Sequence, residues 1–203
     1  MNLFVKTLSL IALYIIASYV AWSMAMPPYF ASVFWPAAGV SLGFVFLYGA
    51  RLLPGVFLGA FLSFLLSPVG NDPNVEGLLA ASFLGLGAAT QAYLGAYLIK
   101  KFVRHNTQFQ TLRSIVLFCV LGALSGVVAS SIALGLFLQT DRIHIDGALT
   151  FWEAWFMGDA LGIVLVAPMT VLALSWRDVS LRRFLAIFVP IFFLSYYCYR
   201  SFC

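Results

Sequence analysis

Charged residues are scarce in this chain of 203 residues. They make up 9% of it, whereas hydrophobic residues make up 63%, and the mean hydropathy is +1.02. Soluble globular domains are about one quarter charged, so this composition excludes an ordinary soluble domain and indicates an integral membrane protein. The net charge of +4 does not indicate nucleic-acid binding, because the cations lie in short connections where membrane topology and anionic headgroups account for them.

Residue types that carry catalysis or bind metals are also rare. The two histidines, His105 and His144, lie in polar connections, so neither is placed to activate a nucleophile inside the membrane. The three cysteines, Cys119, Cys198 and Cys203, have no CxxC spacing and predict neither a disulfide framework nor a zinc site. No HExxH motif or pair of aspartates occurs. We therefore expect no enzyme activity of its own and no cofactor.

Long apolar stretches run almost from end to end. Each is about 16–28 residues long, and a helix needs about 20 residues to cross a bilayer. The stretches are 4–26, 30–49, 52–69, 77–99, 114–138, 148–175 and 184–199. The first is too long for the apolar core of a signal peptide and is expected to be an uncleaved anchor. The sequence predicts an all-α, polytopic bundle of about seven membrane helices, forming one domain over residues 1–203.

The connections between these stretches differ in charge. One alternate set holds nine basic residues: Lys6, Arg51, Lys100, Lys101, Arg104, Arg113, Arg177, Arg182 and Arg183. The other set holds two basic and four acidic residues: Arg142, Arg200, Asp72, Glu76, Asp141 and Asp146. Basic residues are retained on the cytoplasmic side. We therefore expect a multi-pass protein of the plasma membrane with a cytoplasmic N-terminus and a seventh helix that ends outside.

Glycines recur at four-residue spacing within the apolar stretches. The pairs are Gly55 with Gly59, Gly122 with Gly126, and Gly158 with Gly162. Small residues at this spacing let helix backbones approach closely, so we predict that these six glycines pack helices together.

Three prolines lie in or at the ends of the predicted helices. Pro36, Pro54 and Pro168 each free a backbone carbonyl that a neighbour or water must satisfy. Kinks at Pro36 and Pro168 would either open a small central cavity or shape the bundle.

Asp159 is the strongest single candidate for a functional residue. It lies within an apolar stretch and shares one helical face with Trp152 and Trp155, at i, i+3 and i+7. A carboxylate at that depth is costly, so it is expected to face the bundle interior or a wet pocket. Three roles remain open: a structural hydrogen bond to Thr90 or Gln91, contact with a sensed ligand or ion, and a proton relay. Thr90 and Gln91 are themselves either links between helices or part of the same site.

Three ordered blocks resemble a known family. They are residues 34–40 (FWPAAGV), 48–61 (YGARLLPGVFLGAF) and 155–168 (WFMGDALGIVLVAP). They look like the W-P-x-x-G, G-x-x-x-x-P-G-x-x-x-G-A-F and W-x-x-G-D-A-x-G-x-x-x-x-x-P patterns of the first type of membrane-associated sensor domain. Within the first block, Trp35, Pro36 and Gly39 are then candidates for ligand binding or signalling.

The resemblance implies a sensory membrane domain of a bacterial signalling protein, in the inner membrane. Members of that family usually carry a cytoplasmic histidine kinase, diguanylate cyclase or phosphodiesterase as output, after about eight membrane segments. This chain stops at Cys203 after a predicted seventh. We therefore expect either a piece of a longer signalling protein or a partner that acts in trans on a cytoplasmic kinase or cyclase, or together with another membrane protein. The alternative is a small transporter or channel-like protein, favoured by Asp159, the Thr90–Gln91 pair and the prolines.

Overall fold

The computed structural model describes residues 2–24, 32–67, 74–103 and 111–175, and these residues form helices and connections without any strand. The all-α class is therefore confirmed for the described part. The elements are α1 (Leu3–Trp22), α2 (Pro36–Tyr48), η1 (Ala50–Leu52), α3 (Leu53–Leu65), α4 (Val75–Phe102), α5 (Leu112–Leu124), α6 (Gly126–Gln139), η2 (Ile145–Gly147) and α7 (Ala148–Ser175). The two η elements are single 3₁₀ turns.

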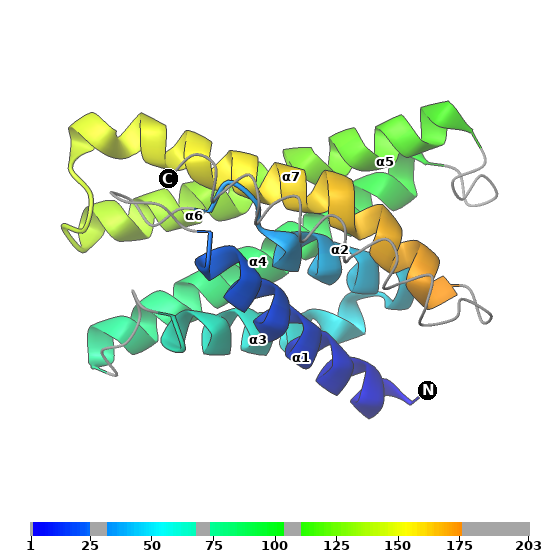
Figure 1. Cartoon of the computed structure of the whole chain (residues 1–203), viewed down its shortest axis with the longest axis horizontal. Helices are drawn as coiled ribbons and strands as arrows, with labels where there is room; N and C mark the ends of the chain where they lie inside the picture. The colour runs from blue at the N-terminus through cyan, green and yellow to red at the C-terminus, as the bar shows by residue number, and fades with distance from the viewer. Residues whose placement is uncertain (1, 25–31, 68–73, 104–110, 176–203) are drawn as a thin grey trace.

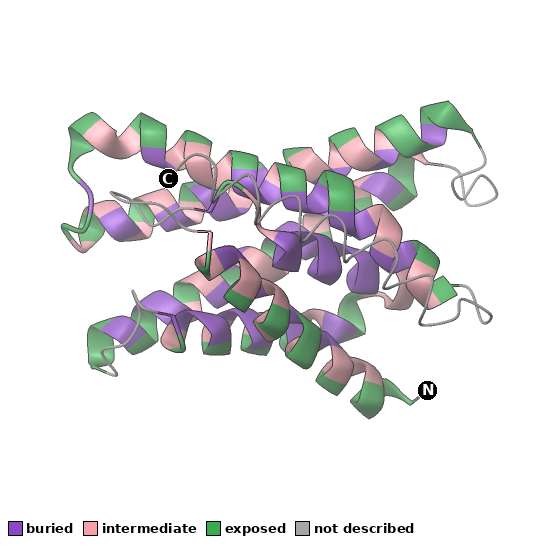
Figure 2. Cartoon of the chain, in the orientation of Figure 1, coloured by how far each residue is buried: buried purple, intermediate pink, exposed green. Residues whose placement is uncertain are grey.

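Helix α2 occupies the centre of the bundle (Figure 1). It packs against α1 and α4 on one side and most extensively against α7 on the other. All ten residues from Pro36 to Val45 are buried, and Figure 2 shows this run of buried positions at the heart of the molecule. In contrast, α1 and α4 expose many large apolar side chains on their outer faces, as expected of helices that face lipid.

Helix lengths divide the described elements into two groups. Four apolar helical runs are long enough to cross a membrane: α1, α4, the run Leu112–Gln139 that contains α5 and α6, and Ile145–Ser175 that contains α7. The other two are shorter, because α2 has 13 residues and the η1–α3 run covers only Ala50–Leu65. The sequence predicted spans over 30–49 and 52–69, so both helices are shorter than expected. The predicted seventh span, 184–199, lies outside the described residues.

Proline explains the late start of α2. Pro36 occupies the first turn of the helix, where its missing N–H costs nothing. The residue before a proline is driven out of the α conformation, and Trp35 has φ −116° and ψ 81°. Residues 32–35 are consequently non-helical, although hydropathy alone assigns them to the same apolar stretch.

Ser125 divides the predicted helix 114–138 into α5 and α6. Its N–H and its hydroxyl both donate to the carbonyl of Gly122, at 3.1 and 2.6 Å. A serine that bonds back to its own helix in this way competes with the regular ladder and bends the helix. The apolar run nevertheless continues through the break.

Basic side chains gather at one end of the bundle. Lys6 Nζ lies 3.9 Å from the centre of the Tyr48 ring, and Lys100 Nζ lies 5.7 Å from the centre of the Phe46 ring. The start of α1, the end of α2 and the end of α4 are therefore neighbours. The start of α4 and the turn between α6 and α7, which hold Glu76, Asp141 and Asp146, lie at the opposite end (Figure 1). The described helix ends thus gather at two ends of the bundle that differ in charge.

Candidate functional site

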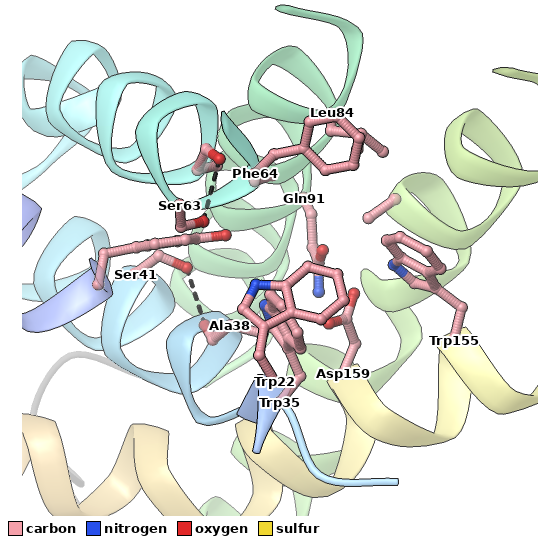
Figure 3. Close-up of a pocket in the computed structure, with 14 residues that line it drawn as sticks. Trp22, Trp35, Ala38, Ser41, Ser63, Phe64, Leu84, Gln91, Trp155 and Asp159 are labelled. Carbon is pink, nitrogen blue, oxygen red and sulfur yellow. Dashed lines mark hydrogen bonds between the residues drawn. The ribbon is translucent and has the colours of Figure 1, made fainter. Parts of the chain in front are cut away.

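A cavity of about 50 Å³ lies inside the bundle, and six helices contribute to its walls (Figure 3). Its polar side chains come from α2, α3, α4 and α7, and its aromatic side chains come from α1, α3, α7 and the residues before α2. The polar members are Ser41, Ser63, Gln91 and Asp159, and the aromatic members are Tyr14, Trp22, Trp35, Phe64 and Trp155. Alanines fill much of the remaining wall.

Asp159 and Gln91 face each other across this cavity (Figure 3). Asp159 on α7 is 3% exposed, and Gln91 on α4 is 4% exposed. The two side chains interact, but Gln91 Nε2 makes no hydrogen bond of ordinary geometry to another group in the described residues. A buried donor without a full partner is costly, so the pair leaves hydrogen-bonding capacity directed into the cavity.

Trp35 is held at the cavity by its own backbone. Its N–H donates to the carbonyl of Gly158 on α7, at 2.9 Å. A side chain at Gly158 would overlap the Ser32 carbonyl, and one at Gly162 would overlap the Trp35 carbonyl. These two glycines, one directly before Asp159 and one about a turn after it, therefore allow the non-helical residues before α2 to lie directly on α7.

The α1 helix supplies two aromatic residues that the sequence reasoning missed. The Trp22 ring lies perpendicular to the Trp35 ring, with centroids 5.2 Å apart and an interplanar angle of 88°. Its indole Nε1 is buried and makes no hydrogen bond among the described residues. Tyr14 is 3% exposed and interacts with Trp35 and Asp159. The spacing of eight residues places Tyr14 and Trp22 on one helical face, and no other feature of the sequence indicates that they line a cavity.

Other predicted candidates lie away from the cavity. Thr90 is exposed, and its hydroxyl donates to the Leu86 carbonyl at 2.8 Å. Trp152 donates from Nε1 to Ser131 Oγ on α6, at 3.1 Å. Gly39 lies against α7, where a side chain would overlap the Gly162 carbonyl. The structure therefore brings together Trp35, Gln91, Trp155 and Asp159, and places Thr90 and Trp152 elsewhere.

The remaining predicted packing glycines lie at helix contacts of different tightness. An added Cβ would come within 3.0 Å of Thr7 at Gly55, 2.9 Å of Tyr14 at Gly59 and 2.7 Å of Ile163 at Gly122. At Gly126 it would meet Phe156 at 3.4 Å, which is an ordinary contact. Gly59 thus helps to place Tyr14 beside the cavity.

The chemistry of the cavity follows from its lining. It has one carboxylate, one carboxamide, two serines and several aromatic rings, and none of its lining residues is Lys, Arg or His. Ser41 and Ser63 donate to carbonyls of their own helices, at 2.9 and 3.0 Å. Within the described ranges, no group of three or more His, Cys, Asp or Glu side chains is placed to hold a metal ion. The site offers one carboxyl group and N–H donors, enclosed by apolar walls.

Comparison with known proteins gives one match. A family model described as MASE1 matches residues 7–201. No curated protein and no solved structure matches the chain. The matched range includes every residue that lines the cavity.

Proposed function

Because the chain belongs to the MASE1 family of membrane sensory domains, we propose that it detects its stimulus at the Asp159 cavity and passes the signal to a cytoplasmic module. The observation that carries this proposal is the buried carboxylate of Asp159, which is 3% exposed and lies where six helices meet. Ionisable side chains inside membrane bundles are costly and mark functional sites.

The proposed orientation follows from charge. The end that holds Lys6, Arg51, Lys100 and Lys101 lies in the cytoplasm, and the end that holds Asp141 and Asp146 lies outside. Seven membrane crossings, including α2, α3 and the stretch 184–199, complete this topology in the plasma membrane of a bacterium.

Two helices connect the cavity with the cytoplasmic end. Helix α2 begins directly after Trp35 and ends beside Lys6, whose Nζ lies 3.9 Å from the centre of the Tyr48 ring. Helix α7 carries Asp159 and continues to Ser175. A stimulus shifts a conformational equilibrium only when it contacts two states differently. The Trp35–Gly158 contact joins the two helices beside the cavity, so an occupant that moves Trp35 changes how α2 lies on α7.

The output is a histidine kinase or an enzyme of cyclic-di-GMP metabolism, joined to this domain in a longer chain or bound to it in trans. The chemistry of signalling then belongs to that module, and this chain contributes the switch. Its partners are the lipid bilayer, the output module and, in the trans arrangement, a second membrane protein.

A fused reporter tests the proposal. A diguanylate cyclase module is joined after Cys203 through one added membrane helix, because the proposed seventh helix ends outside. We expect Asp159→Asn and Trp35→Phe to change the cellular cyclic-di-GMP level by about fivefold or more, the lower range of typical coupling energies. Glu153→Gln, an exposed acid on the same helix, serves as the matched control. Equal output from all four proteins, under every stimulus tried, would remove the support for sensing at this cavity.

One observation favours a small transporter as second candidate. The non-helical residues Ser32–Trp35 lie inside the bundle beside Asp159, and non-helical backbone also lines transporter sites near the membrane midplane. Flux of a solute into proteoliposomes that stops in Asp159→Asn would support transport. Signalling output that depends on Asp159, without such flux, would support the sensor.

A further inference from the structure

We propose that the Asp159 cavity binds a small organic cation that carries both an alkylammonium group and an oxygen atom, such as an amino alcohol. This inference rests on the proposed sensory function, because it names the class of ligand that the same cavity would detect. Three properties of the cavity carry it: its charge, its aromatic walls and its free hydrogen-bond donors.

The acidic side chain of the cavity has no basic partner in the cavity lining. Asp159 is 3% exposed, and no lysine, arginine or histidine lines the cavity. The side chain opposite Asp159 is the neutral amide of Gln91. A positive or strongly donating partner stabilises the ionised form of a buried carboxyl group. The lining does not supply a cation, so a positively charged ligand fits the site.

The walls suit an organic cation. Three tryptophans, Trp22, Trp35 and Trp155, line the cavity together with Tyr14. Aromatic faces attract cations within about 6 Å of the ring centre, tryptophan most strongly, and aromatic cages recognise alkylated ammonium groups. The Trp22 and Trp35 rings pack edge to face, with centroids 5.2 Å apart, and form one aromatic cluster in the cavity lining. One carboxylate and N–H donors do not form the oxygen-rich shell that Ca²⁺ or Mg²⁺ requires.

The free donors indicate the second group of the ligand. Trp22 Nε1 is buried and makes no hydrogen bond among the described residues, and Gln91 Nε2, which interacts with Asp159, makes none of ordinary geometry there. Both need an acceptor, which a hydroxyl or carbonyl oxygen on the ligand provides. The cavity of about 50 Å³ is larger than the minimum of about 10–15 Å³ that one water needs, so it has room for a molecule of a few heavy atoms. A short amino alcohol satisfies charge, donors and size together.

Tryptophan fluorescence provides the direct test, because three of the five tryptophans line the cavity. The full chain is placed in nanodiscs of phosphatidylglycerol, which has no amine headgroup, and titrated with choline, ethanolamine and tetramethylammonium. The control ligand is 3,3-dimethylbutan-1-ol, the uncharged isostere of choline. We expect saturable changes with the cations and none with the isostere. Nanodiscs that contain phosphatidylethanolamine test whether a lipid headgroup supplies the same chemistry.

Variants assign the binding to the proposed groups. Loss of one partner of a buried charge pair typically costs about 2 kcal/mol or more, so Asp159→Asn should weaken choline binding by about thirtyfold or more. Glu153→Gln should leave it unchanged. Gln91→Met keeps the carboxylate, so it should retain tetramethylammonium binding and lose the preference for choline. This second variant keeps the test decisive if Asp159→Asn fails to fold.

The outcomes separate this inference from the proposed function. Absence of a saturable signal with all three cations and with phosphatidylethanolamine, equal binding of the uncharged isostere, or undiminished binding by Asp159→Asn would each overturn the inference. A signal only with phosphatidylethanolamine would support the ligand class and assign it to lipid. Cation binding without any change in cyclase output would instead overturn the sensory function and leave the ligand class standing. Output that depends on Asp159 without cation binding would overturn the ligand class and leave the sensory function standing.

Discussion

Burial of the Asp159 carboxyl group destabilises the fold rather than stabilising it. The group is buried among apolar walls without an ionic partner in the cavity lining. A buried charge without an ionic partner carries a large desolvation cost, which an uncharged side chain of similar volume avoids. We therefore expect Asp159→Asn to unfold at the same temperature as the unmodified chain or at a higher one, measured by circular dichroism in detergent. A clearly lower temperature would show that Asp159 holds the helices together.

Glycine 162 permits the closest backbone approach beside the cavity. A side chain there would overlap the Trp35 carbonyl oxygen, and backbone cannot rotate out of the way as a flexible side chain does. We expect Gly162→Ala to lower the free energy of unfolding by about 1–3 kcal/mol, the usual cost of overpacking. Thermal unfolding in detergent measures this change.

Gly126→Ala is the matched control for that substitution. Its new methyl group would lie 3.4 Å from Phe156, and we expect a change within about 0.5 kcal/mol. Equal destabilisation by the two variants would contradict the close contact between Trp35 and α7.

Individual residues show which parts of the cavity could be predicted from the sequence and which could not. The cost of an intramembrane acid correctly places Asp159 in the interior. Thr90 and Gln91 were grouped as a pair, but successive residues point about 100° apart on a helix, and only Gln91 is buried. Trp22 and Tyr14 could not be distinguished from aromatic residues of a membrane belt, since their role depends on the position of α1 against α2 and α7.

Helix boundaries were less predictable than helix existence. Hydropathy treats residues 30–35 and α2 as one stretch, because it does not register backbone conformation. The non-helical Ser32–Trp35 segment is tolerated because it is packed on α7, where the Gly158 carbonyl accepts the Trp35 N–H. Irregular backbone at membrane depth requires such protein partners, and those partners come from residues more than one hundred positions away.

The backbone carbonyl that the proline in α7 leaves free has a hydrogen-bond partner on α5. Pro168 has no N–H and leaves the Val164 carbonyl without its usual donor within the helix. Cys119 Sγ lies 4.0 Å from that carbonyl oxygen, which is a weak thiol hydrogen bond. Interhelical side-chain hydrogen bonds in membranes are worth about 0.6 kcal/mol on average. We expect Cys119→Ala to lower the free energy of unfolding by about this amount, and Cys119→Ser to preserve it.

A double-mutant cycle isolates that contact. In Pro168→Ala the helix regains the N–H that bonds the Val164 carbonyl, so the further change Cys119→Ala should have little effect. The same loss from Cys119→Ala in both backgrounds would show that the thiol acts through packing alone.

At the scale of the whole molecule, composition and loop charge carry most of the information. They predict an all-α bundle, which the described residues form, and the start of α1 and the ends of α2 and α4 lie together, as the charge pattern predicts. They do not predict that α2 is short and surrounded, since every apolar stretch of similar length appears equivalent in hydropathy. The cavity depends on that central position, because α2 and the residues before it contribute one of its walls.

Topology is the last prediction. A reporter fused after Asn106 should be cytoplasmic, and reporters fused after His144 and after Arg200 should be external, because cations near helix ends resist translocation and seven crossings from a cytoplasmic start end outside. If the fusion after Arg200 alone is cytoplasmic, one helix does not span. The short elements α2 and α3 are then the ones to test, since α7 and its preceding turn form a run of 31 residues. In a cysteine-free background, Arg51→Cys lies between these two helices. It should react with an impermeant maleimide only after the membrane is opened, and labelling of intact cells would contradict two full crossings.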